Sequence, residues 1–258
     1  MSSKTAKPSR TRRHHVTGSP DHPFIVTIDG PAGAGKSTTA KLLAKRLGLR
    51  YLDTGATYRA LAYAARQRHL HPLADVDRIA RLAGRLPLSL QLNKEGRLRV
   101  RLGGADITRE IRSEEVTESA ALISQHPAIR MALVKRQREL ANRHGVVVEG
   151  RDTGSVVFPR ARYKFFLTAD PSVRARRRQG ELAQLYGSRP PIAQVSEQLH
   201  FRDGLDRTRR VGPLVEPPGA ITIDTTRLSA SQVVRAMLLH IRKKAASGSK
   251  LQATGFKT

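Results

Sequence analysis

The sequence contains no cysteine and no tryptophan, and only 4% of its residues are aromatic. Without cysteine there can be no disulfide framework and no thiolate zinc site, which is typical of a reducing compartment. The scarcity of aromatic rings leaves few platforms on which single-stranded nucleic acid could stack. No apolar run approaches the roughly 20 residues that span a bilayer, and the N-terminal residues lack the apolar core of a secretory signal. We therefore expect a cytoplasmic protein without a membrane span.

Acidic residues are also scarce, with 21 Asp and Glu against 47 Lys and Arg, for a net charge of +26. Residues 1–22 are rich in Ser, Lys, Arg and Pro without apolar periodicity, which predicts a disordered basic arm. Residues 246–258 predict a flexible C-terminal tail. The region between them is basic as well. Two explanations remain open, arginines that bind phosphate substrates and a basic patch for RNA.

A glycine-rich segment, residues 30–38, follows the G-x4-G-K-[ST] pattern that binds nucleotide phosphates. An apolar run at 24–28 precedes it and predicts a buried strand, while residues 39–47 have apolar residues at helical spacing. This order of strand, loop and helix directs backbone N–H groups at an anion. The phosphate-binding residues would be Gly30, Pro31, Ala32, Gly33, Ala34, Gly35, Lys36, Ser37 and Thr38.

Two side chains of this segment have expected roles. Lys36 would reach the terminal phosphates of a nucleoside triphosphate, and the hydroxyl of Ser37 would bind Mg²⁺. The sequence therefore predicts a protein that binds a nucleoside triphosphate.

The remaining pattern is one of strands alternating with helices. Further strands are predicted at 49–52, 146–149, 162–167 and 220–224, and helices at 73–85, 113–123, 127–143, from 172 onward and at 229–244. Residues 88–92 and 98–102 alternate apolar and polar residues around a turn, which predicts a β-hairpin inserted between the βα units. We expect an α/β fold of the P-loop NTPase type, with three layers and a five-stranded parallel sheet.

Charged residues follow two of the predicted strands, at the sheet edge where open α/β folds bind ligands. Asp53 and Thr54 precede a helix that carries Arg59, so they could cap that helix or bind a ligand. Arg151 and Asp152 follow a buried strand, and this position favours a ligand site over an ordinary surface pair.

The helices near the C-terminus are rich in arginine. Arg174, Arg176, Arg177 and Arg178 would point around the whole helix and repel one another unless anions bind. A following helix carries Arg202, Asp206 and Arg209.

The presence of arginines or of a carboxylate base indicates which kind of group accepts the phosphate. An alcohol acceptor requires a carboxylate base, whereas a nucleoside monophosphate already carries nearly two negative charges and requires neutralisation by arginines. The sequence has no obvious isolated catalytic acid, and it offers Arg59, Arg130, Arg151, Arg177, Arg178, Arg202 and Arg209. This favours a phosphate group as the acceptor.

Six segments together resemble those of the bacterial cytidylate kinases: residues 28–37, 52–59, 110–112, 149–154, 157–159 and 202–209. The similarity extends from about residue 24 to 242. It implies transfer of the γ-phosphate of ATP to CMP or dCMP with Mg²⁺, in a domain over 23–245. It also implies an NMP-binding insert at about 53–143 and a mobile lid at about 172–209. We expect a monomer, with nucleic acid as a further partner of the basic tails that the reaction does not require.

The resemblance also implies roles for single residues. The expected catalytic residues are Lys36, Arg151, Arg177, Arg178 and Arg209. Thr54, Arg59 and Arg151 resemble residues that bind the monophosphate or its sugar, and Arg130 and Asp152 resemble those that recognise cytosine. Arg202, Asp206 and Arg209 resemble the group near the sugar and the transferred phosphate.

One departure and two alternatives qualify this interpretation. Ala121 stands where the family often has a serine that contacts the base, so we expect less strict selection of cytosine. The first alternative is a kinase for another small acceptor, such as UMP or shikimate. The second is an NTP-binding RNA-interaction protein that uses its basic arms.

Overall fold

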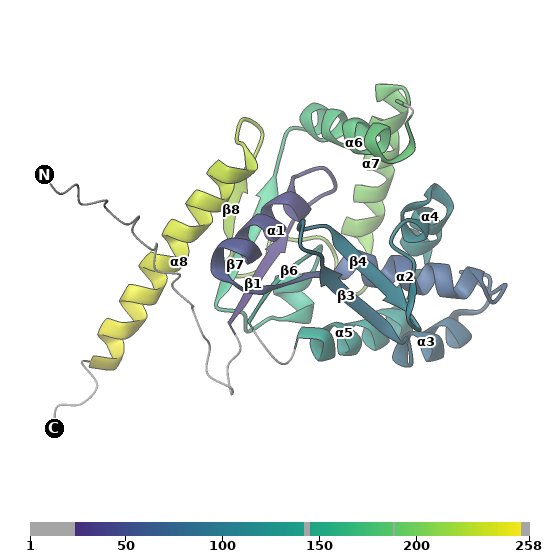
Figure 1. Cartoon of the computed structure of the whole chain (residues 1–258), viewed down its shortest axis with the longest axis horizontal. Helices are drawn as coiled ribbons and strands as arrows, with labels where there is room; N and C mark the ends of the chain where they lie inside the picture. The colour runs from purple at the N-terminus through teal and green to yellow at the C-terminus, as the bar shows by residue number, and fades with distance from the viewer. Residues whose placement is uncertain (1–23, 142–144, 188, 254–258) are drawn as a thin grey trace, which may run out of the picture.

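The structure is a computed structural model that describes residues 24–141, 145–187 and 189–253 (Figure 1). The predicted N-terminal arm, residues 1–22, and residues 254–258 of the predicted tail lie outside the described residues. Their predictions therefore stay untested.

A five-stranded parallel sheet forms the centre of the fold, as predicted. Its strands lie in the order β2 (Arg50–Asp53), β6 (Val146–Gly150), β1 (Ile25–Asp29), β7 (Tyr163–Thr168) and β8 (Ile221–Asp224). Strands β1 and β6 are buried almost throughout because they are central in the sheet, which explains their nearly continuous apolar sequence. Their carboxyl ends lie side by side, with Asp29 opposite Gly150.

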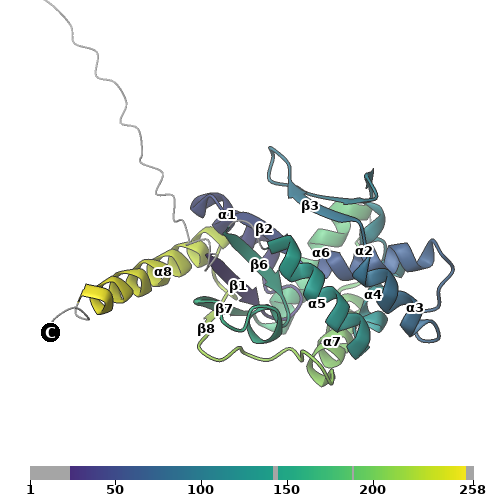
Figure 2. The same ribbon diagram turned by 90° about the horizontal axis from the view of Figure 1, so that it is seen from below.

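Helices pack against this sheet. Helix α1 (Lys36–Leu47) contacts β6 and the long C-terminal helix α8 (Ala230–Ala253), which projects away from the rest of the molecule in Figures 1 and 2. Helix α8 continues to Ala253, so the predicted helix end at 244 is wrong, while the predicted flexibility of the tail stays untested. Alanine, lysine, leucine and glutamine in this segment favour a helix more strongly than Gly248 and its neighbouring serines disfavour it.

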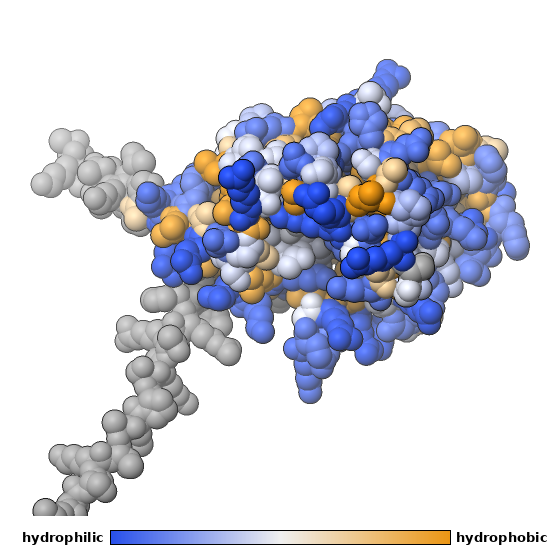
Figure 3. Space-filling view, turned by 90° about the horizontal axis from the view of Figure 1, so that it is seen from above, coloured by the Kyte–Doolittle hydropathy of each residue, from blue (hydrophilic) through white to orange (hydrophobic). Residues whose placement is uncertain are grey.

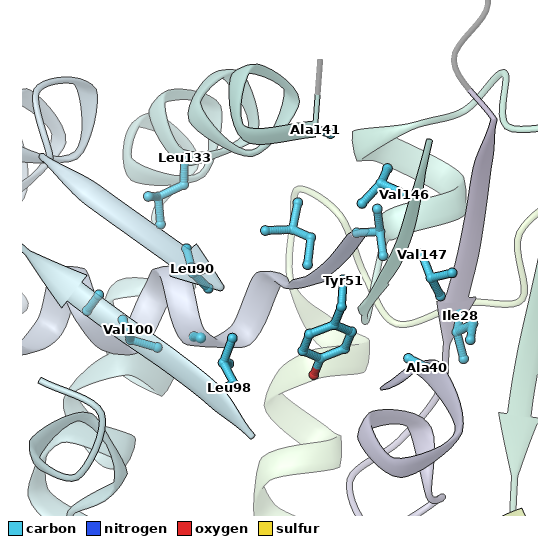
Figure 4. Close-up of a cluster of buried hydrophobic side chains, with 14 of the residues drawn as sticks. Ile28, Ala40, Tyr51, Leu90, Leu98, Val100, Leu133, Ala141, Val146 and Val147 are labelled. Carbon is cyan, nitrogen blue, oxygen red and sulfur yellow. The ribbon is translucent and has the colours of Figure 1, made fainter. Parts of the chain in front are cut away.

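The segment between β2 and β6, where the NMP-binding insert is predicted, contains eight elements in its described part. They are α2 (Thr54–Arg66), α3 (Val76–Gly84), β3 (Leu88–Leu92), β4 (Leu98–Leu102), β5 (Ala105–Asp106), η1 (Glu110–Arg112), α4 (Glu114–Ile123) and α5 (Pro127–Ala141). The predicted hairpin is confirmed, with Leu90 paired to Val100. Figure 4 shows how its apolar face reaches Leu133 of α5, so hairpin and sheet share one hydrophobic core.

Two helices near the C-terminus, α6 (Pro171–Tyr186) and α7 (Ile192–Thr208), pack on each other and form the segment that we call the lid. A small apolar cluster of Ala32, Ala175, Val195 and Leu199 joins the lid to the phosphate-binding loop. Helix α7 begins at Ile192, immediately after two prolines that set its N-terminus. A short π-helical turn, η2 (Thr153–Val157), follows β6.

The surface reflects the excess of basic residues. The face shown in Figure 3 is largely hydrophilic, with small and separate apolar patches. Among the described helices none is both long and apolar enough to cross a membrane.

Candidate active site

A cavity of about 370 Å³ lies beyond the carboxyl ends of the central strands. Its walls come from the phosphate-binding loop, the start of α2, helix α4, the turn after β6 and the two lid helices. Most predicted site residues line it, namely Ala32, Gly33, Gly35, Lys36, Ser37, Thr38, Thr54, Arg59, Arg151, Asp152, Arg178, Arg202, Asp206 and Arg209. The predicted residues that do not line it are Gly30, Pro31, Ala34, Arg130 and Arg177.

The phosphate-binding loop needs its glycines for two reasons. Gly33 and Gly35 have φ of 75° and 81°, in the left-handed region that favours glycine. A Cβ on Gly33 would also lie 2.7 Å from the carbonyl oxygen of Arg174, so the lid packs directly on the loop. The loop is thereby held as a turn that opens toward the cavity.

Lys36 begins α1 and is only 6% exposed. Its Nζ donates a hydrogen bond to the carbonyl oxygen of Pro31 at 2.7 Å. Burial lowers the pKa of Lys36 from 10.5 to about 7, and the neighbouring positive charge of Arg151 adds to this effect. An anion at this position would restore the charge of the lysine.

Glu149 is a candidate site residue that the residue-by-residue sequence analysis did not single out. It is the second-last residue of β6, is buried, lines the cavity and accepts a hydrogen bond from the Tyr51 hydroxyl. Burial raises the pKa of Glu149, against the opposing effects of Lys36 and of hydrogen bonds from Ser37 and Tyr51. The signal was present in the sequence, because an acid ends the strand that neighbours the phosphate-binding loop.

Asp53 and Arg59 form a pair at the start of α2. Asp53 caps the helix by accepting from the backbone N–H of Ala56 at 2.9 Å, and its other oxygen binds Nη2 of Arg59 at 2.9 Å. The predicted cap is therefore confirmed. Thr54 is buried and donates from its hydroxyl to the carbonyl oxygen of Glu149 at 2.7 Å, which ties α2 to β6.

Arg130 and Asp152 form a buried ion pair with exposures of 1% and 7% for the two side chains. Arg130 also donates to the carbonyl oxygen of Ser124 at 3.2 Å and lies 5.5 Å from the ring centroid of Tyr58. A Cβ on Gly212 would clash with both members of the pair. Asp152 is thus on the cavity wall, with Arg130 behind it.

Asp206 lies among three arginines. It binds Nε of Arg151 at 2.7 Å and Nη1 of Arg209 at 3.3 Å. Burial opposes the ionisation of Asp206, but Arg151, Arg209 and Arg202 together hold its pKa below the usual value. Burial lowers the pKa of Arg202 to about 10, and Arg151 adds to this effect. The group therefore keeps an excess of positive charge beside the cavity.

The two predicted lid arginines, Arg177 and Arg178, make different contacts. Arg178 lines the cavity and pairs with Glu181 at 3.1 Å. Arg177 instead donates to the carbonyl oxygen of Thr225 at 2.7 Å, and the Thr225 hydroxyl donates to the carbonyl oxygen of Ala34. Arg177 thus braces the phosphate-binding loop from behind.

Arg174 was not predicted as a site residue, and it is paired rather than free to bind an anion. It forms a buried ion pair with Asp203 of α7 and donates to the carbonyl oxygen of Ala32 at 3.2 Å. Asp203 in turn accepts from the backbone N–H of Ala32 at 3.3 Å. The expectation that the helix arginines repel one another until anions bind is therefore wrong for Arg174, because the packing of α6 on α7 supplies an acid.

Ala121 lines the cavity and contributes no hydroxyl, but Ser124 lines it one turn later. The hydroxyl of Ser124 donates to the carbonyl oxygen of Ala121 at 2.8 Å. A hydroxyl oxygen is therefore present on this wall, on the residue that caps the C-terminus of α4.

The comparisons with known proteins agree with this geometry. The sequence model of the family described as cytidylate kinase matches residues 26–243. The cytidylate kinase of Pelotomaculum thermopropionicum is 46% identical over 216 residues, covering 84% of this chain and 95% of that protein. The cytidylate kinase of Caldanaerobacter subterraneus subsp. tengcongensis is 45% identical over 218 residues, covering 84% of this chain and 94% of that protein.

A solved structure of shikimate kinase from Acinetobacter baumannii aligns with a TM-score of 0.41 and 18% identity. The alignment covers 86% of this chain and 94% of that one, but it is too remote to support an argument. The family match and the two relatives confirm the resemblance to the cytidylate kinases that the sequence motifs indicate. This chain belongs to the cytidylate kinase family of nucleoside monophosphate kinases.

Proposed function

We propose that the enzyme transfers the γ-phosphate of ATP to CMP or dCMP, giving ADP and CDP or dCDP, in pyrimidine nucleotide metabolism. The observation that carries this proposal is one cavity with a phosphate-binding loop on one wall and Asp152, backed by Arg130, on another. An oxygen of the CMP phosphate attacks the γ-phosphorus, and the bond from that phosphorus to the β,γ-bridging oxygen breaks, releasing ADP.

The donor is bound by the loop that precedes α1. The backbone N–H groups of the loop and the N-terminus of α1 bind the β- and γ-phosphates of ATP. Lys36 adds a positive charge when the phosphates bind, and its buried position strengthens the attraction between that charge and the phosphates. Ala32 and Gly33 are fixed by the lid, so the loop requires little rearrangement when ATP binds.

Ser37 and Glu149 would hold Mg²⁺. Their chemistry fits the ion, because a hydroxyl and a buried carboxylate beside Lys36 supply hard oxygen ligands on the cavity wall. When bound, Mg²⁺ supplies charge neutralisation of the phosphate oxygens. Tyr51 orients Glu149 by donating to its carboxylate.

The acceptor phosphate is bound by arginines on the opposite side. Arg59, Arg151, Arg202 and Arg209 line the cavity and neutralise the two polyanions as they approach. Asp206 keeps Arg151 and Arg209 in place through its ion pairs. Thr54 helps to fix the acceptor by joining α2 to β6, and Arg178 reaches the transferred phosphate from the lid.

Asp152 recognises the base. Its carboxylate accepts from the N4 amino group of cytosine, a donor that uracil lacks. Arg130 acts through Asp152, since it is buried behind the wall and holds the carboxylate in a fixed orientation.

A coupled assay of the four nucleoside monophosphates and dCMP, with ATP and Mg²⁺, tests the proposal. We expect CMP and dCMP to be the best acceptors by kcat/KM, with Ala121 leaving some activity on UMP. Equal or higher activity on UMP or AMP would contradict it. The alternative of an RNA-interaction protein is not supported by the family match, which covers residues 26–243.

The proposal also covers the setting of the enzyme. We propose that the enzyme is cytoplasmic, where ATP is available. We also propose that it is a monomer, because the face shown in Figure 3 is largely hydrophilic. Light scattering of the purified full chain tests the monomer. The basic tails remain available for weak, salt-sensitive binding to nucleic acid.

A further inference from the structure

Asp29 is a fully buried carboxylate to which the proposed reaction assigns no role. It is the last residue of β1, directly before Gly30 of the phosphate-binding loop, and its exposure is 0%. It lies opposite Gly150, the last residue of β6. The side chain is therefore at the junction between the loop that binds the donor and the turn that carries Arg151 and Asp152.

All three hydrogen bonds of this carboxylate go to that turn. Oδ1 accepts from the backbone N–H and the hydroxyl of Thr153, each at 2.8 Å, and Oδ2 accepts from the backbone N–H of Gly154 at 2.7 Å. Thr153 begins the π-helical turn, and Asp152 is the residue that precedes it. Asp29 consequently holds the two backbone groups that immediately follow the base-recognising residue.

The turn has no room to move toward the strand. A Cβ on Gly154 would lie 2.8 Å from the hydroxyl of Thr27, the residue two positions before Asp29. Thr153 and Gly154 are both buried. The turn is therefore packed against β1 as well as bonded to it, and its position depends on the strand that ends at the phosphate-binding loop.

Asp29 does not obtain its stability from an opposite charge. None of the ion pairs found among the described residues includes it. The charged groups that influence it are Asp152 on the turn, which disfavours its ionisation, and Lys164 on β7. The buried charge of Asp29 is instead compensated by its three hydrogen bonds to the turn, so the carboxylate and the turn hold each other in place.

We propose that Asp29 is a positioning residue for the acceptor site, which fixes Arg151 and Asp152 relative to the phosphate-binding loop by binding the turn that follows them. This inference rests on the proposed function. The same carboxylate belongs to the donor strand and holds the acceptor turn, so it sets the distance between the two substrates. Misplacing a substrate by about 1 Å can reduce turnover by two orders of magnitude.

The role requires the ionised carboxylate. Protonation of Asp29 would remove the negative charge that strengthens the bonds from the two backbone N–H groups, and the new O–H could donate only to the Thr153 hydroxyl, whose own hydrogen bond to Asp29 would have to reverse. Burial raises the pKa of Asp29 from 3.8 to about 6, against the hydrogen bonds of Gly154 and Thr153. The turn should therefore loosen as the pH falls through about 6.

Three variants of the full chain test the proposal. Asp29→Asn replaces one acceptor oxygen with an NH₂ donor that faces a backbone N–H, and Thr153→Val removes only the hydroxyl donor. Asp106→Asn is the matched control, because Asp106 also accepts from the N–H and hydroxyl of a threonine, Thr108, but is exposed on the hairpin. KM values for CMP and ATP, kcat and the melting temperature are measured for each.

We expect KM for CMP to rise about tenfold in Asp29→Asn and less in Thr153→Val, with KM for ATP nearly unchanged and the control normal. Amide exchange of Thr153 and Gly154 in the wild type, without nucleotides, should accelerate relative to other buried amides below about pH 6, and this dependence should vanish in Asp29→Asn. A parallel rise of both KM values, or unchanged CMP kinetics, would overturn the proposal. If Asp29→Asn does not fold, the same comparison of KM for CMP with KM for ATP is made on Thr153→Val, and an unchanged KM for CMP in that variant would overturn the proposal.

Failure of this inference differs from failure of the proposed function. If the wild type does not phosphorylate CMP, the proposed function fails. If the wild type phosphorylates CMP and the variants match the control, only the role of Asp29 fails.

Discussion

Asp152 reaches the cavity wall while Arg130, its ion-pair partner, is buried behind it with an exposure of 1%. The arginine fixes the orientation of the carboxylate and compensates its charge in the protein interior. Removal of either partner would leave a buried charge without compensation, which is strongly destabilising. The carboxylate that we propose recognises the base is thus part of the protein interior as well as of the cavity wall.

Asp152→Asn should lower the preference for CMP over UMP by about tenfold or more in kcat/KM. The carboxylate faces an amino donor in CMP but a carbonyl oxygen in UMP, whereas an asparagine amide can satisfy either. Arg130→Lys is a useful companion, since it should weaken selectivity indirectly while leaving Asp152 in place. The CMP/UMP ratio is read from the coupled assay, and an unchanged ratio in Asp152→Asn would end the assignment of this residue to the base.

Lys36→Ala should reduce kcat by about 10² to 10³-fold, because a charge that stabilises the transferring phosphate is lost. Lys45→Ala, on the exposed face of the same helix, is the control. Normal melting temperatures show that the fold is retained. Near-normal turnover in a folded Lys36→Ala protein would show that this lysine is not catalytic.

The lowered pKa of Lys36, about 7, predicts proton uptake when ATP binds. Above pH 7 the free enzyme has a largely neutral lysine, and the phosphates of ATP favour the charged form. Because the unfolded chain binds the proton up to its usual pKa of 10.5, the contribution of Lys36 to stability rises with pH between about 7 and 10.5. Titration calorimetry at pH 8 in two buffers of different ionisation enthalpy measures the uptake, which should disappear in Lys36→Ala and persist in Lys45→Ala.

The lid should depend on the ion pair of Arg174 and Asp203. Both residues bind the backbone of Ala32, so Asp203→Asn should loosen the lid and raise KM for ATP. Breaking a buried pair costs about 3–5 kcal/mol, whereas the exposed pair of Arg136 and Glu139 is worth about 1 kcal/mol at most. Glu139→Gln is therefore the control. Hydrogen exchange across residues 172–187 should be faster in Asp203→Asn alone, and equal exchange in both variants would contradict this role.

The sequence was sufficient to predict the central sheet and most of the cavity wall, because both depend on local patterns. Apolar runs predicted the strands, and the position of Arg151 and Asp152 after one of them predicted the site. Residues that act through distant partners could not be predicted in this way. Arg174 is paired with Asp203, 29 positions away, and Arg177 binds Thr225, 48 positions away. Only tertiary packing determines which arginines of one helix face phosphate and which face protein.

The last prediction concerns two residues on the cavity wall, Ala121 of α4 and Ser124, which caps the C-terminus of that helix. The Ser124 hydroxyl donates to the carbonyl oxygen of Ala121 and accepts from Nε2 of Gln125 at 3.4 Å, which leaves one further lone pair on its oxygen as an acceptor. An acceptor on this wall favours the amino group of cytosine over the carbonyl of uracil. Ser124→Ala should therefore lower the CMP/UMP ratio, and Ala121→Ser should raise it, each by about two- to tenfold for one neutral hydrogen bond.

The competing interpretation is that both residues only pack within α4, in which case the substitutions change stability and leave selectivity unchanged. Ser119→Ala separates the two interpretations, because Ser119 is a buried serine of the same helix that does not line the cavity. It should alter the melting temperature without altering the ratio. If Ser124→Ala behaves as Ser119→Ala does, its melting temperature changes and its CMP/UMP ratio stays constant. Ser124 then does not contribute to base recognition, which is left to Asp152, and it does not compensate for the absence of a serine at position 121.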